Sequence, residues 1–221
     1  MKARVARLKR VTRETNIVIR LNLDGRGRAK VDTGIPFFNH MLELFARHGM
    51  MDLTLKAKGD LEVDLHHTVE DCGIVLGEAF NKALGDRKGI RRYGTGFDPR
   101  NPMCGESYVP MDETLVRCVI DFGGRPYLVW KGFDSLAYKR LTREEKTQDP
   151  ACAFRFGLAR EFFQGFVNHS RCNLHIELLY GHEPHHIVEA VFKAFARAVD
   201  EACRRDPRIS NQIPSTKGRL I

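Results

Sequence analysis

The chain carries one short pattern of residues twice, and this repeat limits the fold more than any other feature of the sequence. His66-His67-Thr68-Val69-Glu70 returns as His185-His186-Ile187-Val188-Glu189. Adding 119 to positions 69, 79 and 83 leads to an identical residue each time, and an offset of 121 does the same for positions 48 and 53. We therefore predict that the two halves of the chain are copies of one folding unit.

The spacing of apolar residues predicts the elements of each half. Residues 16–23 alternate as a strand does, whereas apolar residues in 36–48 recur with helical spacing. Further strands are predicted at 53–57, 61–65, 115–122, 126–130 and 173–179, and further helices at about 68–84, 158–168 and 185–204. We expect a single α/β domain, an α+β sandwich of two β-α halves at about 1–94 and 106–221. Residues 95–105 and about 131–150 are expected to be inserted surface loops.

The composition fits one globular domain and favours anionic partners. With 221 residues, 43% of them hydrophobic, the chain is long enough to bury a sizeable core. The net charge of +8 favours anions without distinguishing RNA, a membrane surface or a small phosphate. No apolar run approaches the roughly 20 residues of a transmembrane helix. Six cysteines without a Cys-x-x-Cys pair indicate a reducing compartment, so we expect a cytoplasmic protein.

The repeated pattern has the residue types and the spacing of a metal site. Residues four apart share a face of a helix, so the first His of each pair would point with the Glu while the second points elsewhere. Each cluster would thus serve two ions. Adding His40 and its counterpart Glu161 gives eight imidazole or carboxylate ligands, which suit two divalent metals; Mn, Fe and Zn all fit, and octahedral coordination favours Mn. Either His pair alone would more simply be surface or capping residues, but the duplication favours the metal site.

A wider set of segments resembles the imidazoleglycerol-phosphate dehydratase family along almost the whole chain. Besides the two clusters, with Asp71 after the first, the matching segments are Arg13-Glu14-Thr15, Asn39-His40-Met41-Leu42, Arg47-His48-Gly49, Gly59-Asp60-Leu61, Val109-Pro110-Met111-Asp112-Glu113, Gly124-Arg125-Pro126-Tyr127 and Pro214-Ser215-Thr216-Lys217-Gly218. A resemblance carried by so many separate segments is highly specific.

The resemblance implies an activity, a fold and an assembly. The family's enzymes are hydro-lyases of histidine biosynthesis, which dehydrate D-erythro-imidazole glycerol phosphate to imidazole acetol phosphate. Two Mn²⁺ ions per active site would hold the substrate ring as imidazolate. The implied fold is a duplicated sandwich of the ribosomal protein S5 domain 2 type. The implied partners are a small phosphate substrate and further copies of the chain, about 24 in all with sites between subunits, but neither nucleic acid nor membrane.

The family's site residues map onto two metal sets, an acid/base group and a phosphate site. One metal would take His40, His67, His185 and Glu189, and the other His66, Glu70, Glu161 and His186. Glu14 would be the acid/base group, with His48, Glu70 and Glu189 as further catalytic residues. The phosphate would be held by Arg92, Arg125, Lys193, Ser215, Thr216 and Lys217. Further substrate contacts would come from Glu14, His40, His48, His66, His67, Glu70 and His185.

Three residues depart from the family's pattern. Asn39 stands where Asp usually precedes the ligand His, and we expect its neutral amide to polarise His40 less. Leu65 replaces a usual Asp before the first His pair, and Glu161 stands where His is common. A carboxylate still binds divalent metals, so Glu161 is kept among the ligands.

Two other classes of function share some of these features. A dinuclear metallohydrolase acting on phosphate esters would need the same ligand types and would use a bridging hydroxide as nucleophile. A nucleic-acid-binding protein would account for the positive charge, but the sequence lacks a recognition motif or a stripe of aromatic and basic residues. The dehydratase is therefore the leading hypothesis.

Overall fold

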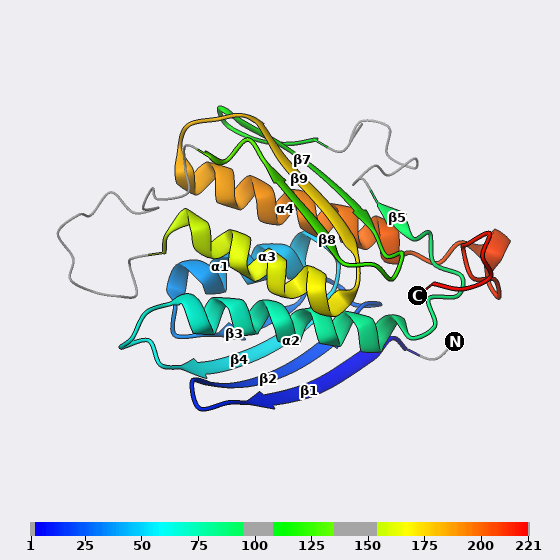
Figure 1. Ribbon diagram of the computed structural model, residues 1–221, viewed down its shortest axis with the longest axis horizontal. Coiled ribbons are helices and arrows are strands. Elements are labelled where there is room, and N and C mark those ends of the chain that lie inside the picture. Colours follow the sequence, from blue (N-terminus) through cyan, green and yellow to red (C-terminus); the bar gives the residue numbers. More distant parts are fainter. Residues whose placement is uncertain (1–2, 95–107, 135–153, 221) are drawn as a thin grey trace.

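Helices lie between two β-sheets in the computed structural model, which describes residues 3–94, 108–134 and 154–220 (Figure 1). One sheet and its two helices come from the first half of the chain, and the other sheet and its two helices come from the second. The helices of the two halves face each other, so the layers run sheet, helices, helices, sheet. Within the described residues, no helix is long and apolar enough to cross a membrane.

The two halves have the same strand order. The first sheet runs β1-β2-β4-β3, with β3 parallel to β4, and the second runs β5-β7-β9-β8, with β6 also on β7 and β8 parallel to β9. The first half contains β1 (Val5–Val11), β2 (Thr15–Asn22), β3 (Ala29–Asp32), α1 (Pro36–His48), β4 (Asp52–Gly59) and α2 (His66–Leu84). The second contains β5 (Tyr93–Gly94), β6 (Tyr108–Met111), β7 (Thr114–Asp121), β8 (Tyr127–Lys131), α3 (Phe156–Ser170), β9 (Asn173–Tyr180), α4 (Pro184–Cys203) and the short 3₁₀ helix η3 (Pro207–Ile209). The predicted fold class, a sandwich of two β-α halves, is confirmed.

Aromatic side chains from all four α-helices fill the space between the halves. Phe38 of α1 packs on Phe162 of α3 with ring centroids 5.5 Å apart, and Phe45 of α1 stacks on Phe195 of α4 at 5.1 Å. Phe80 brings α2 into the same layer, and all of these rings are buried. Burying one such side chain stabilises a fold by about 1.5–3 kcal/mol, so this layer fixes how the halves sit against each other.

Two glycines let α2 and α3 approach closely near the first histidine cluster. A Cβ atom on Gly73 of α2 would lie 2.2 Å from the carbonyl oxygen of Phe162, and one on Gly165 of α3 would lie 2.9 Å from the carbonyl oxygen of Glu70. A larger residue at either place would push the helices apart, because the neighbouring atoms are backbone. The contact therefore holds the first turns of α3 against the turn of α2 that carries Glu70.

The predicted helices and most predicted strands are confirmed to within about two residues at each end, but one predicted strand is wrong. Residues 61–65 form a turn, in which the amide of Val63 donates to the carbonyl oxygen of Asp60. Leu61 and Leu65 alternate with polar residues because both pack against the core from this turn, while Val63 is exposed to solvent. Strands β1, β3 and β6 are present in the structure but are not among the predicted strands, because they are short or carry mostly basic and half-exposed residues.

The two predicted insertions lie mainly outside the described residues, which include neither 95–105 nor 135–150. At 131–134 the prediction of a surface loop is wrong. Lys131 ends β8, and Phe133 is only 2% exposed, with its ring stacked 4.3 Å from that of Trp130. The core therefore continues past the end of the strand, because Phe133 buries its aromatic side chain while the residues on either side of it stay exposed.

Candidate metal and phosphate sites

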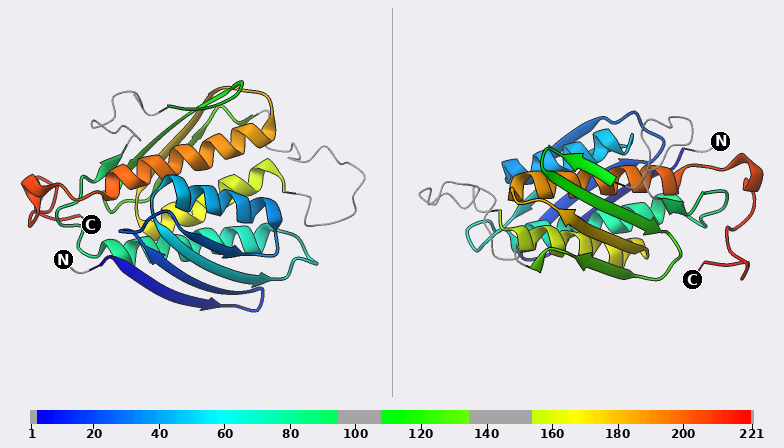
Figure 2. Two further views of the ribbon diagram at one scale, coloured as in Figure 1. Left: turned by 180° about the vertical axis from the view of Figure 1, so that it is seen from behind. Right: turned by 90° about the horizontal axis from the view of Figure 1, so that it is seen from above.

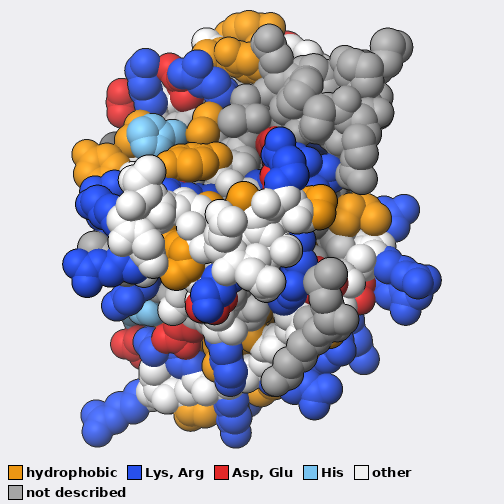
Figure 3. All heavy atoms as spheres, turned by 90° about the vertical axis from the view of Figure 1, so that its right-hand side faces the viewer, with side chains coloured by type: hydrophobic (Ala, Val, Ile, Leu, Met, Phe, Trp, Pro, Cys, Tyr) orange, Lys and Arg blue, Asp and Glu red, His pale blue; other side chains and the backbone are white. Residues whose placement is uncertain are grey.

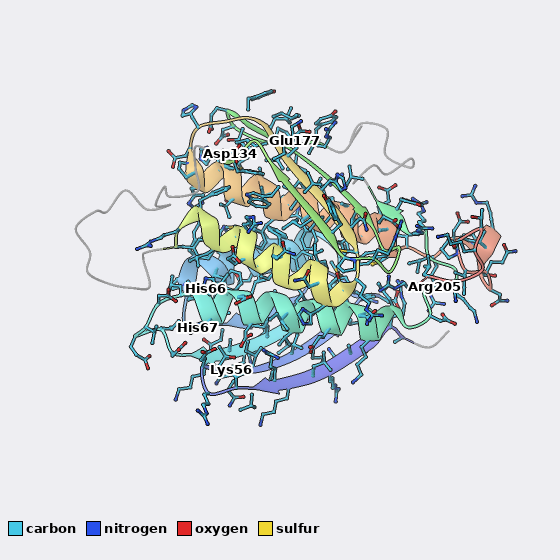
Figure 4. All side chains as sticks on the ribbon, in the orientation of Figure 1. Lys56, His66, His67, Asp134, Glu177 and Arg205 are labelled. Carbon is cyan, nitrogen blue, oxygen red and sulfur yellow. The ribbon has the colours of Figure 1, made fainter. Side chains whose placement is uncertain are left out.

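The first histidine cluster lies at the N-terminus of α2, which begins at His66 itself. The Nε2 atom of His66 is 3.4 Å from Oε2 of Glu70, one helical turn further on, as their spacing predicts. The ring of His67 stands almost perpendicular to that of His66, at 86°, and its Nδ1 lies 3.0 Å from Oδ2 of Asp60. Its Nε2 lies 3.8 Å from Oε1 of Glu14. Figure 4 labels both histidines at this end of α2.

The second cluster repeats this geometry at the N-terminus of α4. The Nε2 atom of His185 is 3.4 Å from Oε2 of Glu189, and the rings of His185 and His186 meet at 87°. The Nδ1 atom of His186 lies 2.8 Å from Oε2 of Glu113, and its Nε2 lies 3.6 Å from Oδ2 of Asp112. Each cluster thus presents two imidazoles in two directions, the first beside its own glutamate and the second between two carboxylates.

A residue from the first half joins the second cluster. Helices α1 and α4 run side by side (Figure 2), and Nε2 of His40 lies 3.8 Å from the same Glu189 oxygen that His185 approaches. The other oxygen of Glu189 is 2.7 Å from Nζ of Lys193. Burial of Glu189 opposes its ionisation, but this ammonium and the nearby imidazoles keep the pKa of Glu189 below its usual value. The structure therefore places Lys193 beside a candidate metal ligand.

His48 lies at the C-terminal end of α1, near α4. Burial, followed by the charges of Lys193 and Arg197, lowers the pKa of His48. The lowered pKa favours the neutral imidazole, which can donate a hydrogen bond from one nitrogen and accept one at the other.

Glu161 lies in the second turn of α3 and forms an ion pair with Arg160, with 3.3 Å between Oε1 and Nη1. The close packing of α3 on α2 brings this turn to the side of the molecule that carries His66 and Glu70. Across the part of the chain that the structure describes, no group of three His, Cys, Asp or Glu side chains is arranged to hold a metal ion. The members of each predicted ligand set are thus not gathered around one point among these described residues.

Two carboxylates beside the second histidines carry roles that the sequence reasoning missed. The hydrogen bond with Asp60 raises the pKa of His67, and that with Glu113 raises the pKa of His186. Both contacts engage Nδ1, which leaves Nε2 as the nitrogen directed at a ligand. Asp60 and Glu113 stand in segments quoted for the family resemblance. Asp60 precedes His67 by seven residues across a turn and Glu113 lies 73 residues before His186, so neither spacing is one that a helix or strand would pair.

The loop that carries Glu14 is tied down from two sides. Oγ1 of Thr12 accepts hydrogen bonds from the backbone amides of Glu14, at 3.1 Å, and Thr15, at 2.9 Å. The hydroxyl of Thr15 donates to the buried carboxylate of Asp71 on α2, and Nε of Arg10 donates to it at 3.2 Å. This network fixes the β1-β2 hairpin against the helix that carries the first cluster.

Most of the predicted phosphate residues line one hollow of about 480 Å³ near the C-terminus. Arg92, Arg125, Ser215, Thr216 and Lys217 are among its lining residues. Figure 3 shows this side of the molecule, over which Lys and Arg side chains are spread with fewer acidic ones. The hollow thus combines guanidinium, ammonium and hydroxyl groups, which are suited to an anion.

Arg92 organises this hollow. It donates to Asp121 from Nε, at 2.6 Å, and from Nη2, at 3.0 Å, and to the carbonyl oxygen of Pro214 at 2.9 Å. A guanidinium has five N–H donors, so two remain for a ligand. Lys193, by contrast, is not among the residues that line the hollow.

The hollow lies far from the histidine clusters of the same chain. The amide of Arg92 donates to the carbonyl oxygen of Ala202, near the end of α4, whereas His185 and His186 lie at its start. At 1.5 Å per residue, these positions are roughly 25 Å apart. Figure 4 labels His66 and His67 toward one end of the molecule and Arg205 toward the other.

Two departures from the family's pattern have structural explanations. Oδ1 of Asn39 accepts hydrogen bonds from the amide of Thr33, at 2.9 Å, and from its hydroxyl, at 2.6 Å. These bonds hold the loop before α1, and the expectation that Asn39 polarises His40 less stays a prediction. Leu65 is 4% exposed and belongs to the core, so an apolar residue suits that position.

The fold and these clusters define a class of protein, a duplicated α/β sandwich with imidazole and carboxylate groups at the start of the second helix of each half. Solved structures share this fold. Over 91% of this chain and 99% of the other, the imidazoleglycerol-phosphate dehydratase of Staphylococcus aureus superposes with a TM-score of 0.70 and 34% identity. That of Pyrococcus furiosus superposes with a TM-score of 0.72 and 30% identity, over 96% of this chain and all of the other.

Sequence comparison places the chain within the same family. The family model described as imidazoleglycerol-phosphate dehydratase matches residues 33–199. The enzyme of that name from Herminiimonas arsenicoxydans is 50% identical over 218 residues, which cover 99% of this chain and 98% of the relative. That from Akkermansia muciniphila is 51% identical over 217 residues, covering 98% and 100%. The chain belongs to the imidazoleglycerol-phosphate dehydratase family, and its expected class of enzyme, a hydro-lyase, is confirmed.

Proposed function

We propose that the chain dehydrates D-erythro-imidazole glycerol phosphate to imidazole acetol phosphate, a step of histidine biosynthesis, in the cytoplasm. The observation that carries this proposal is the pair of matching clusters, each with one imidazole 3.4 Å from a glutamate and a second imidazole perpendicular to it. The four free cysteines among the described residues fit a reducing compartment.

We further propose two Mn²⁺ ions per site. The donors are imidazole nitrogens and carboxylate oxygens without a thiolate, a set that fits this metal. One ion would be held by His40, His67, His185 and Glu189, and the other by His66, Glu70, Glu161 and His186. When bound, the ions supply Lewis-acid chemistry, which holds the ring of the substrate as its anion.

The active site is proposed to form between copies of the chain. His40, His185 and Glu189 lie together and lack His67, which lies with His66 and Glu70 in the other cluster. The substrate has only three carbons between ring and phosphate, so it cannot span the roughly 25 Å from a cluster to the phosphate hollow of the same chain. One complete site would contain one cluster from one copy of the chain, and the other cluster and the phosphate hollow from neighbouring copies. We propose that the homo-oligomer has 24 subunits.

The chain's own groups have separate tasks in this reaction. Arg92, Arg125, Ser215, Thr216 and Lys217 bind the phosphate and fix the position of the chain carbons. The carboxylate of Glu14, beside Nε2 of His67, takes the proton from the middle carbon. The bond between the hydroxyl and the carbon next to the ring breaks, and Glu14 returns the proton to this hydroxyl, which leaves as water. The resulting enol becomes the ketone. His48 is a substrate contact in this scheme, and its lowered pKa favours a neutral ring, which can accept a hydrogen bond or a proton.

Product analysis tests the proposed function. Purified chain with Mn²⁺ and imidazole glycerol phosphate should form the keto phosphate without releasing inorganic phosphate. A chelator should abolish turnover, and added Mn²⁺ should restore it. Release of inorganic phosphate without a keto product would support the alternative, a dinuclear hydrolase of phosphate esters.

A further inference from the structure

Two hairpins contact the second histidine of each cluster, His67 and His186. Their turns are equivalent in position, but the equivalent glutamates contact different ring nitrogens. Thr12 and Thr15 close the β1-β2 hairpin around two central residues, of which Glu14 is the second. Met111 and Thr114 close the β6-β7 hairpin in the same way, so the counterpart of Glu14 is Glu113. Glu14, however, approaches Nε2 of its histidine, whereas Glu113 bonds to Nδ1.

The two glutamates contact different ring nitrogens because of the residue that follows β4 in the first half and β9 in the second. In the first half, Asp60 follows β4, and its carboxylate forms a hydrogen bond with Nδ1 of His67. The residue after β9 is Gly181, with φ +146°, and a Cβ atom there would lie 2.4 Å from Oγ1 of Thr114. No carboxylate can therefore be placed at this point in the second half, and Glu113 takes over the bond to Nδ1 of His186.

The exchange leaves Nε2 of His186 without the counterpart of Glu14, and Asp112 fills that place. Its Oδ2 lies 3.6 Å from Nε2 of His186, close to the 3.8 Å between Glu14 and His67. Within the described residues, its carboxylate has no hydrogen-bond partner, and its side chain is 72% exposed.

The backbone of the β6-β7 turn determines where the carboxylate of Asp112 lies. This residue is the first central residue of a two-residue hairpin and has φ +48°, in the left-handed region where glycine is strain-free. Asp is among the residues that tolerate this conformation, so the turn accommodates Asp112 and fixes its carboxylate near Nε2 of His186.

We propose that Asp112 is a second substrate-contacting carboxylate, which accepts a hydrogen bond from a chain hydroxyl of the substrate on the side of the site opposite Glu14. This inference rests on the proposed function. If the second cluster of one copy meets the first cluster of a neighbour, Asp112 and the neighbour's Glu14 flank the same ring-binding position. The two carboxylates then lie on either side of the glycerol chain of the substrate. The hydrogen bond to Asp112 favours binding of a substrate that carries a hydroxyl group on this chain.

The keto phosphate product provides a built-in control, because its chain has lost its hydroxyl groups. Asp112→Gly should lower kcat/KM for imidazole glycerol phosphate about tenfold, the loss of one charge-assisted hydrogen bond. The affinity for imidazole acetol phosphate, measured by calorimetry, and the bound Mn²⁺ should stay unchanged. Asp112→Asn should fall between, since its amide oxygen still accepts a hydrogen bond, and Asp86→Asn, at the far end of α2, should match the wild type.

Thermal unfolding keeps this test separate from misfolding. Asp112→Gly should have a Tm equal to or above that of the wild type, since glycine adopts the positive φ without strain. An unchanged kcat/KM, or a parallel loss of product affinity or of bound Mn²⁺, would overturn the role of Asp112 alone. A wild-type chain that forms no keto phosphate would instead overturn the proposed function and this inference with it.

Discussion

Each second histidine has a carboxylate near either ring nitrogen, and the two contacts have different consequences. Asp60 and Glu113 bond to Nδ1 of His67 and His186, which fixes the tautomer and the direction of each ring. The first histidines, by contrast, approach the glutamate one turn further along their own helix. At the scale of residues, the site is thus a set of pre-oriented imidazoles.

The two glutamates of the clusters should each be needed for one metal set. We predict that Glu70→Gln and Glu189→Gln lower the affinity for Mn²⁺ by at least about 100-fold and abolish turnover, because even loss of a group behind a ligand costs 10–100-fold. Metal analysis of the purified variants measures this loss. Glu78→Gln, on the same helix as Glu70, serves as the control. Wild-type metal content in both cluster variants would show that these glutamates are not ligands.

Metal binding should depend on pH through the second histidines. Asp60 and Glu113 raise the pKa of His67 and His186, so protons compete with the metal at a higher pH than for free histidine. The charged forms are stabilised in the metal-free chain at low pH, and this stabilisation is lost as pH rises through the raised pKa values. We predict that the affinity for Mn²⁺ falls from pH 8 to pH 6, by about tenfold per unit for each displaced proton. Calorimetry in two buffers, which counts released protons, should show this; a constant affinity would contradict it.

At the scale of elements, the β1-β2 hairpin acts as the support of Glu14. Asp71 of α2 accepts hydrogen bonds from Thr15 in this hairpin and from Arg10 in β1. The position 119 residues later is Ala190, so the second half lacks this anchor and instead ties its hairpin to the amide of Glu183 through Glu113, at 2.9 Å. The halves thus reach the same geometry by different bonds.

Removing the anchor should separate positioning from metal binding. Asp71→Ala leaves the buried hydroxyl of Thr15 without its acceptor, so we predict a loss of about 2 kcal/mol in the free energy of unfolding. Turnover should fall with little change in KM, because Glu14 is no longer held in place, while bound Mn²⁺ stays the same. Urea denaturation and steady-state kinetics measure both effects, with Glu78→Ala as the control on the same helix. Wild-type kcat in Asp71→Ala would rule out this positioning role.

At the scale of the whole molecule, the proposed site requires more than one copy. The second cluster and the phosphate hollow of one chain lie roughly 25 Å apart, and each proposed metal set would take ligands from both clusters. Assembly and metal binding are therefore expected to stabilise each other.

Mixing two inactive variants tests this arrangement. If Glu70→Gln and Glu189→Gln are dissociated without metal, mixed in equal amounts and reassembled with Mn²⁺, about a quarter of the sites should receive an intact cluster from each variant. Turnover should then recover to about a quarter of the wild-type value. Each variant reassembled alone is the control. Failure to recover any turnover, with mixed assemblies shown by mass spectrometry, would place both clusters of a site in one chain.

The sequence by itself determined the duplication, the helices and the composition of both clusters, because these depend on local spacing. Residues four apart on a helix share a face whatever surrounds it, so the contact of His66 with Glu70 and of His185 with Glu189 follows from the sequence. The resemblance also brought together five residues that line the phosphate hollow, from segments more than a hundred residues apart.

Only the tertiary structure decided which distant residues complete these groups. The packing of α1 on α4 brings His40 to Glu189, and two hairpins carry Glu14, Asp112 and Glu113 to histidines dozens of residues away. It also folded residues 61–65 into a turn where the alternation of apolar residues had predicted a strand. These contacts arise where packed layers meet, and no spacing along the chain specifies which surfaces face each other.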